Sequence, residues 1–167
     1  GDLPQEMRNR QLLTDRFVAV VRKGHPALGK RFTLEQFVGI AHIQVAPRGK
    51  PGGYIDDVLR ERGLARRVAR AVPYFVTALQ LVATTDYILT ISERIAKRYE
   101  SALDLQLIEV PLKLRPYALS LVWHPRVDSD AGHRFLRDVF LRAAREVAGE
   151  RHQDARTRLD ATDPTSG

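Results

Sequence analysis

Phe17-Val18-Ala19-Val20-Val21 is an unbroken apolar segment whose three valines are β-branched. It does not alternate between apolar and polar residues, as a strand with one wet face would, so it predicts a strand that is buried on both faces. Strands of this kind are typical of sheets that carry helices on both sides. The segment therefore predicts an α/β fold.

The sequence after this strand alternates between helix and strand patterns. Thr33-Leu34-Glu35-Gln36 has the spacing of a capping box and predicts a short helix that runs to about Val38. Further strands are predicted at residues 42–46, 68–72, 86–91, 105–110 and 117–123, and further helices at 54–62, from 73, at 92–97 and at 130–149. This order predicts a mixed, doubly wound sheet covered on both faces.

Individual residues are expected to fix the helix ends and the helix faces. Ser92 and Asp130 suit helix starts, whereas Gly63 and Gly149 suit helix ends. Pro73 suits the first turn of its helix, because its missing N–H costs nothing there. The buried stripe expected for that helix consists of Phe75, Val76, Leu79 and Val82.

The composition excludes several classes of protein. The 167 residues contain no Cys, which excludes disulfides, thiolate metal sites and a cysteine nucleophile, and fits a reducing cytoplasm. No apolar run approaches the ~20 residues that span a bilayer, and residues 1–10 are polar. The net charge of +7 comes from scattered arginines, which favours a solvated surface over a DNA-binding face. We expect a cytoplasmic chain that does not contact a membrane.

The loop at residues 47–53 is a candidate anion site. It contains Arg48, Gly49, Lys50 and Gly52 and precedes a predicted helix, whose N-terminal N–H groups favour a negative charge. It has neither the Walker spacing nor the dinucleotide-binding glycine pattern. Taken alone, it also fits an ordinary loop in which glycine serves the turn geometry.

Three further side chains could join this site. Tyr74 and Phe75 open a helix directly after a strand, where an aromatic pair could stack on a ligand, although Phe75 also suits a core position. Thr85 could add a hydroxyl donor to the same cleft, or it could satisfy local backbone groups. The five histidines lack metal-binding spacing, and no catalytic motif is present, so we expect no metal, no cofactor and no enzymatic activity.

Six short motifs in order resemble one family. They are Asp15-Arg16-Phe17-Val18, Gly24-His25-Pro26, Leu34 to Phe37, Val72-Pro73-Tyr74-Phe75, Thr85-Asp86-Tyr87-Ile88 and Trp123-His124-Pro125-Arg126. Together they resemble the effector-binding domain of LysR-type transcriptional regulators over about residues 3–145. The resemblance is closest to the branch that controls nodulation and the degradation of aromatic compounds.

The resemblance implies a two-lobed fold like that of type-2 periplasmic binding proteins. Residues 1–17 would be the remnant of lobe I, residues 18–109 lobe II, residues 110–149 the return to lobe I, and residues 150–167 a disordered tail. The DNA-binding helix-turn-helix domain and the first part of lobe I would lie outside this sequence. The last strand and helix are too thin a layer to bury their own apolar faces, so something should cover them.

The resemblance also implies a mechanism. A small aromatic or acidic effector would bind between the lobes, near Arg48 and Tyr74, and shift the lobes about a hinge. The expected hinge residues are Val20, Val21, Ile108 and Val110. The chain would form homo-oligomers and would reach DNA only through the missing domain. The alternative is the solute-binding protein of a transporter, which predicts a secretion signal and a complete first lobe.

Overall fold

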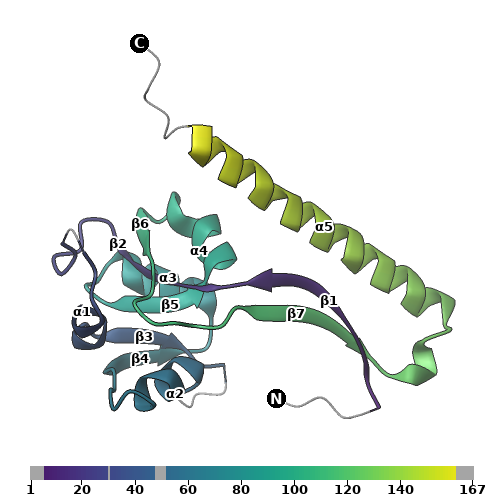
Figure 1. Ribbon diagram of the computed structural model, residues 1–167, viewed down its shortest axis with the longest axis horizontal. Helices are drawn as coiled ribbons and strands as arrows, with labels where there is room; N and C mark the ends of the chain where they lie inside the picture. Colours follow the sequence, from purple (N-terminus) through teal and green to yellow (C-terminus); the bar gives the residue numbers. More distant parts are fainter. Residues whose placement is uncertain (1–5, 30, 48–51, 161–167) are drawn as a thin grey trace. The chain divides into compact units, whose positions relative to one another are not determined.

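The computed structural model describes residues 6–29, 31–47 and 52–160, with side chains as far as Gly149. The chain divides into two compact units (Figure 1). Unit 2 consists of residues 15–116, and unit 1 consists of residues 1–14 and 117–167. The two connections between the units therefore lie at Thr14/Asp15 and at Pro116/Tyr117.

Unit 2 contains a five-stranded mixed sheet with the strand order β4-β3-β5-β2-β6. The strands are β2 (Phe17–Arg22), β3 (His42–Val45), β4 (Val68–Val72), β5 (Ile88–Ser92) and β6 (Leu105–Ile108). β3 pairs in parallel with β4 and β5, whereas β2 pairs antiparallel with β5 and β6. The predicted mixed α/β sheet is confirmed.

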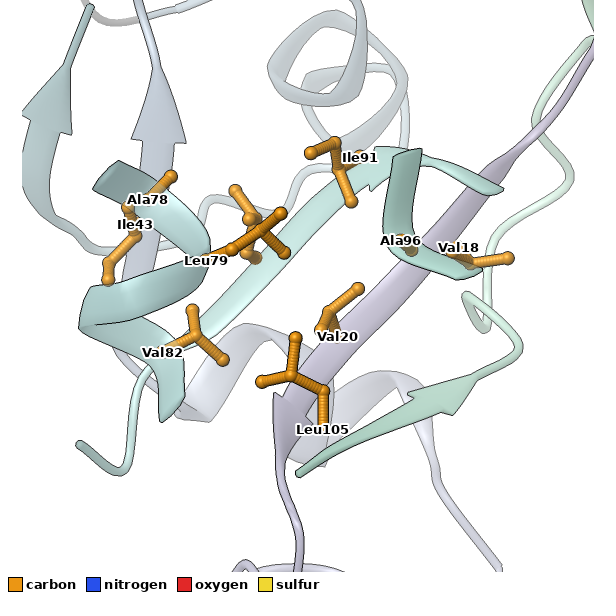
Figure 2. Packing of buried hydrophobic residues seen from close by; sticks show 10 residues of the cluster. Val18, Val20, Ile43, Ala78, Leu79, Val82, Ile91, Ala96 and Leu105 are labelled. Carbon is orange, nitrogen blue, oxygen red and sulfur yellow. The ribbon is translucent and has the colours of Figure 1, made fainter. Parts of the chain in front are cut away.

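Helices cover both faces of this sheet, and the residues of β2 pack against helices on each face. Val18 and Val20 pack in a cluster with Leu79 of α3 (Phe75–Ala83) and Ala96 of α4 (Glu93–Glu100), as Figure 2 shows. The alternate residues of β2 face a second cluster, formed with α1 (Leu34–Gly39) and α2 (Tyr54–Arg60). Because side chains alternate along a strand, both faces of an apolar strand are buried in this arrangement. The prediction for residues 17–21 is therefore confirmed.

Local capping signals place the helix ends of unit 2. Thr33 and Gln36 form the predicted capping box, in which the Gln36 N–H donates to Thr33 Oγ1 at 3.3 Å and the Thr33 N–H donates to Gln36 Oε1 at 2.8 Å. Ser92 Oγ accepts from the Ile95 N–H at 3.3 Å and begins α4 as predicted. After α2 the chain turns at Gly63, which has a φ of +68°, a backbone conformation that favours glycine.

The prediction for α3 is partly wrong. Leu79 and Val82 are buried, but Phe75 is 45% exposed and Val76 is 41% exposed. Tyr74 is the N-cap, so Pro73 precedes the helix instead of lying in its first turn.

Unit 1 contains β1 (Arg8–Asp15) except for its last residue, together with β7 (Tyr117–Trp123), the short helix η1 (Pro125–Val127) and α5 (Ala131–Asp160). β1 and β7 form a two-stranded sheet. Strand β1 was not predicted, because the polar run Arg8-Asn9-Arg10-Gln11 lacks the β-branched and aromatic residues that are enriched in strands. Asp130 accepts from the His133 N–H at 2.8 Å and caps α5 as predicted.

Helix α5 is longer than predicted. The helix continues to Asp160 instead of ending at Gly149, because one glycine costs a helix only ~1 kcal/mol and strong helix formers follow it. Residues 161–167 of the expected disordered tail lie outside the described residues.

The large apolar side chains of α5 at the helical spacing, namely Phe135, Leu136, Val139, Phe140 and Val147, are exposed by 38–63%. In the part of the chain that the structure describes, no helix is both long and apolar enough to cross a membrane.

Candidate ligand-binding site

Three helix N-termini lie at one edge of the unit 2 sheet. Strands β3, β4 and β5 are mutually parallel, so their carboxyl ends point to the same edge, which we call the carboxyl edge. α2, α3 and α4 begin there, with Gly53, Tyr74 and Ser92 as their N-caps. Open α/β sheets bind ligands outside the carboxyl ends of their strands. Gly52 and Tyr74, two of the predicted site residues, both belong to this edge.

The loop before α2 is fastened to β3 by one side chain. Gln44 Oε1 accepts from the Gly52 N–H at 3.0 Å, and Gln44 Nε2 donates to the Gly52 carbonyl at 2.9 Å. Gly52 has a φ of +111° and Gly53 a φ of +150°, conformations that L side chains rarely adopt. Glycine is therefore needed at this turn. The other predicted loop residues, Arg48, Gly49 and Lys50, lie outside the described residues.

The aromatic residues at the carboxyl edge are accessible. The Tyr74 side chain has the largest exposure of the large hydrophobic residues described, 69%, and Phe75 is 45% exposed. Phe75 is thus not part of the core, which was the alternative reading of this residue. An exposed aromatic pair at a helix start offers a ring face together with the phenol group of Tyr74.

Tyr54 is a further aromatic residue that the sequence analysis did not single out. Its ring centroid lies 6.0 Å from that of Phe17, and its hydroxyl accepts from the Arg115 N–H at 2.7 Å. Tyr54 thereby joins the start of α2 to the start of β2 and to the segment after β6. The contact partners are 37 and 61 positions away in sequence, so no local pattern could predict them.

Thr85 does not belong to this edge, which corrects the prediction. It lies between the end of α3 and the start of β5, at the amino end of the parallel strands. The nine residues of α3, with a rise of 1.5 Å each, separate it from Tyr74 by about 14 Å. The Thr85 hydroxyl donates to the Leu81 carbonyl at 2.6 Å and accepts from the Tyr87 N–H at 3.4 Å. The Thr85 hydroxyl thus satisfies local backbone groups, which was the alternative to ligand binding.

Arg16 organises the charged part of the carboxyl edge. It donates to both carboxylate oxygens of Glu93, from Nε at 3.0 Å and from Nη2 at 2.8 Å, and Nη1 donates to Glu109 at 2.6 Å. The hydrogen bonds to Glu93 and Glu109 raise the pKa of Arg16, and the hydrogen bond from Arg16 lowers the pKa of Glu93. The start of β2, the start of α4 and the segment after β6 are therefore held together.

A buried carboxylate supports the same junction. Asp15 is 2% exposed, accepts from the Arg16 N–H at 2.8 Å and accepts from the Ser92 hydroxyl. The Glu93 N–H donates to the Arg16 carbonyl at 2.9 Å. These contacts rigidify the N-terminus of α4 at the carboxyl edge.

The four expected hinge residues all lie inside unit 2. Val20 and Val21 are fully buried in the middle of β2, which is bonded to a strand on each side. Ile108 ends β6, and Val110 is buried in the core. A strand paired on both sides cannot change its backbone dihedrals without breaking two ladders, so Val20 and Val21 are poorly suited to a hinge. The connections between the units lie at residues 14/15 and 116/117 instead.

Metal ligands are not grouped in the described chain. Within residues 6–29, 31–47 and 52–160, no cluster of three or more His, Asp or Glu side chains could hold a metal ion. The groups present at the carboxyl edge are aromatic faces, backbone N–H groups at helix starts and the Tyr74 hydroxyl.

The five-stranded mixed sheet, with helices on both faces, has the fold of one lobe of a type-2 periplasmic binding protein. The family model of the LysR substrate binding domain matches residues 2–145, and the chain belongs to this family. The predicted family and fold class are confirmed.

The relatives found by comparison are transcriptional regulators. The chain is 37% identical over 145 residues to the HTH-type transcriptional regulator SyrM of Rhizobium meliloti (strain 1021), covering 86% of this chain and 44% of SyrM. It is 33% identical over 132 residues to the HTH-type transcriptional activator NagR of a Ralstonia species, covering 79% of this chain and 44% of NagR. The match thus spans less than half of each relative.

Solved structures agree with this assignment. A probable transcriptional regulator from Pseudomonas aeruginosa matches with a TM-score of 0.76 and 32% identity, covering 84% of this chain and 46% of that one. The chain is therefore similar, in sequence and in fold, to a part of larger transcriptional regulators.

Proposed function

We propose that this chain is the ligand-sensing part of a LysR-type transcriptional regulator and that its effector is a small aromatic or acidic molecule. The effector would bind at the carboxyl edge of unit 2 and contact Tyr74, Phe75 and the loop with Arg48 and Lys50. The observation that carries the proposal is the exposure of Tyr74, 69%, at a helix start on that edge. A large aromatic side chain that the core does not use is available for a ligand.

The chemistry of the edge supports an aromatic acid in particular. Tyr74 and Phe75 offer ring faces for an aromatic group. Unpaired N–H groups at the start of α3 and the cationic side chains of the loop favour a carboxylate. Gln44 and the glycines at 52 and 53 hold the end of that loop next to α2.

In the mechanism we propose, the effector acts by changing the orientation of the two units. It can do so only if its affinity differs between the two arrangements, and a coupling of ~1–3 kcal/mol is typical of such regulation. The backbone change would occur at residues 14–15 and 116–117, where the chain passes between the units. DNA would be contacted by a part of the regulator outside this chain.

We further propose that the chain associates with a second copy. The apolar side chains of α5 that are 38–63% exposed would be covered in the complex. Sedimentation at several concentrations tests this, because a strict monomer over the whole range contradicts it. The relatives are transcriptional regulators, which does not favour the alternative of a transporter's solute-binding protein.

A thermal-shift screen with a panel of aromatic carboxylic acids tests the effector site. A ligand at 100 times its dissociation constant should stabilise the chain by ~2.7 kcal/mol. We expect Tyr74→Ala to abolish the shift and Thr84→Ala, an exposed residue at the other edge, to retain it. Equal shifts in the two variants, or no stabiliser in the panel, would contradict the proposed site.

A further inference from the structure

Unit 1 contains a cavity of about 290 Å³ that shares no residue with the carboxyl edge of unit 2. Its walls come from β1, β7 and α5. Leu121 and Trp123 are two positions apart on β7 and share one face of the sheet, and Leu141 of α5 is the third apolar lining residue. The eight lining residues are Arg10, Leu121, Trp123, Asp128, Arg134, Arg137, Asp138 and Leu141.

One arginine in this cavity is held rigidly. The Arg137 guanidinium stacks over the Trp123 ring at 4.8 Å from its centroid, and its side chain is only 15% exposed. It donates to the Val127 carbonyl at 3.3 Å and to the Asp128 carbonyl at 2.7 Å. These bonds use two of its five N–H groups within the described part of the chain. Arg137 is thus a fixed cation with donors to spare.

The charges around the cavity favour an anion. Asp128 is already engaged, because its Oδ1 accepts from Trp123 Nε1 at 2.7 Å and its carboxylate lies 4.0 Å from Arg8 and 3.9 Å from Arg137. Arg10 and Arg134, by contrast, form no ion pair with any described residue. Three arginines therefore face the space, and Asp138 is the remaining acid.

We propose that this cavity binds a small organic monocarboxylate. The carboxylate would accept hydrogen bonds from Arg134, Arg10 and the spare N–H groups of Arg137, and the apolar body would rest on Leu121 and Leu141. Charge-assisted bonds to arginine are strong and bidentate, which suits a planar carboxylate. A volume near 300 Å³ is at the small end of ligand pockets, so the ligand is a compact acid.

The single Trp of the chain makes the proposal directly testable. Cyclohexanecarboxylate, which does not absorb where indole does, should change the Trp123 fluorescence and the indole N–H resonance in a saturable way. The neutral isostere cyclohexylmethanol should produce a much weaker change. Because Trp123 lies in unit 1, the signal is independent of an effector at Tyr74.

Variants at the exposed rim assign the response to the cavity. Arg134→Ala and Arg10→Ala should each weaken cyclohexanecarboxylate binding about fivefold, as the loss of one exposed charge contact does. Arg134→Lys, which keeps the charge but loses the bidentate fork, should bind with an affinity between those of the unaltered chain and Arg134→Ala. Arg142→Ala, on the same helix but outside the cavity, should bind like the unaltered chain. Circular dichroism verifies that every variant is folded.

Three results would overturn the proposal: equal responses to the acid and the alcohol, unaltered affinity in both Arg10→Ala and Arg134→Ala, or no saturable Trp123 signal in the millimolar range.

Discussion

Arg66 forms a bidentate ion pair with Asp56, from Nε to Oδ1 at 2.8 Å and from Nη2 to Oδ2 at 3.0 Å. The Arg66 side chain is 3% exposed, so water cannot replace this partner. The pair fastens α2 to the segment before β4. Arg66 Nη1 also lies 3.4 Å from His42 Nδ1, which links the pair to β3.

Removal of the carboxylate from this pair should destabilise the chain strongly. Asp56→Ala leaves a buried guanidinium without its counter-charge, which costs about 3 kcal/mol. Asp57→Ala is the matched control, because Asp57 is the adjacent acid and pairs with Arg60 on the surface, where a pair is worth less than ~1 kcal/mol. Urea denaturation of both variants measures the free energy of unfolding. Equal losses in the two variants would show that the buried pair stabilises the chain no more than the surface pair does.

His42 should make stability fall in acid. It is fully buried, and burial lowers its pKa to about 4, against an ordinary value of 6.5. Because the Phe37 carbonyl can only accept, His42 Nε2 carries the proton of the 2.8 Å hydrogen bond, and Nδ1 is left facing Arg66. Between pH 6.5 and 4 the unfolded chain binds a proton that the folded chain does not. The free energy of unfolding therefore decreases as the pH is lowered through this window, by up to ~3 kcal/mol.

The pH profile of unfolding by urea checks this. His42→Gln should remove most of the slope between pH 6.5 and 4, whereas His133→Gln, at an exposed position, should preserve it. A slope that survives in His42→Gln would assign the acid sensitivity to other groups.

Arg16→Ala should loosen the carboxyl edge. It removes both hydrogen bonds that Arg16 donates to the carboxylate of Glu93, whose side chain is only 10% exposed. We expect a loss of ~1–3 kcal/mol, as for other hydrogen bonds to charged groups. Lys23→Ala is the control, because the Lys23–Asp104 pair is 71% and 76% exposed. Hydrogen exchange at the start of α4 should accelerate in Arg16→Ala, and protection equal to that of Lys23→Ala would argue against this role.

Gly52→Ala should disturb the loop before α2 through backbone strain. Alanine at a φ of +111° costs ~1–3 kcal/mol, and the strain can be relieved by releasing the two hydrogen bonds to Gln44. Gly29→Ala is the control, since Gly29 is not in this φ range and a Cβ there would meet no atom. Thermal denaturation of the two variants gives the comparison, and identical melting temperatures would contradict the strained conformation.

The sequence predicted the elements whose signals are local. Val20 and Val21 identified a strand buried on both faces, and Thr33 and Gln36 identified a capping box, because both patterns depend on neighbours a few positions apart. Tyr74 and Gly52 could be assigned to one edge because the order of strands and helices implies it.

The remaining features depend on contacts between distant residues. The partners of Arg16 are 77 and 93 positions away, and no spacing rule connects them. Thr85 was assigned to the wrong edge because its position relative to Tyr74 depends on the direction of α3 across the sheet. β1 was missed because its pairing with β7 overrides a polar local sequence.

In the function we propose, an effector binds at the carboxyl edge of unit 2. An amide NMR titration with an acid that stabilises the chain tests it most directly. We expect saturable amide shifts at Gly52, Gly53, Tyr74 and Phe75, and none at Thr84 to Asp86 on the opposite edge. Shifts concentrated at Thr84 to Asp86, with Tyr74 and Gly52 unmoved, would contradict it.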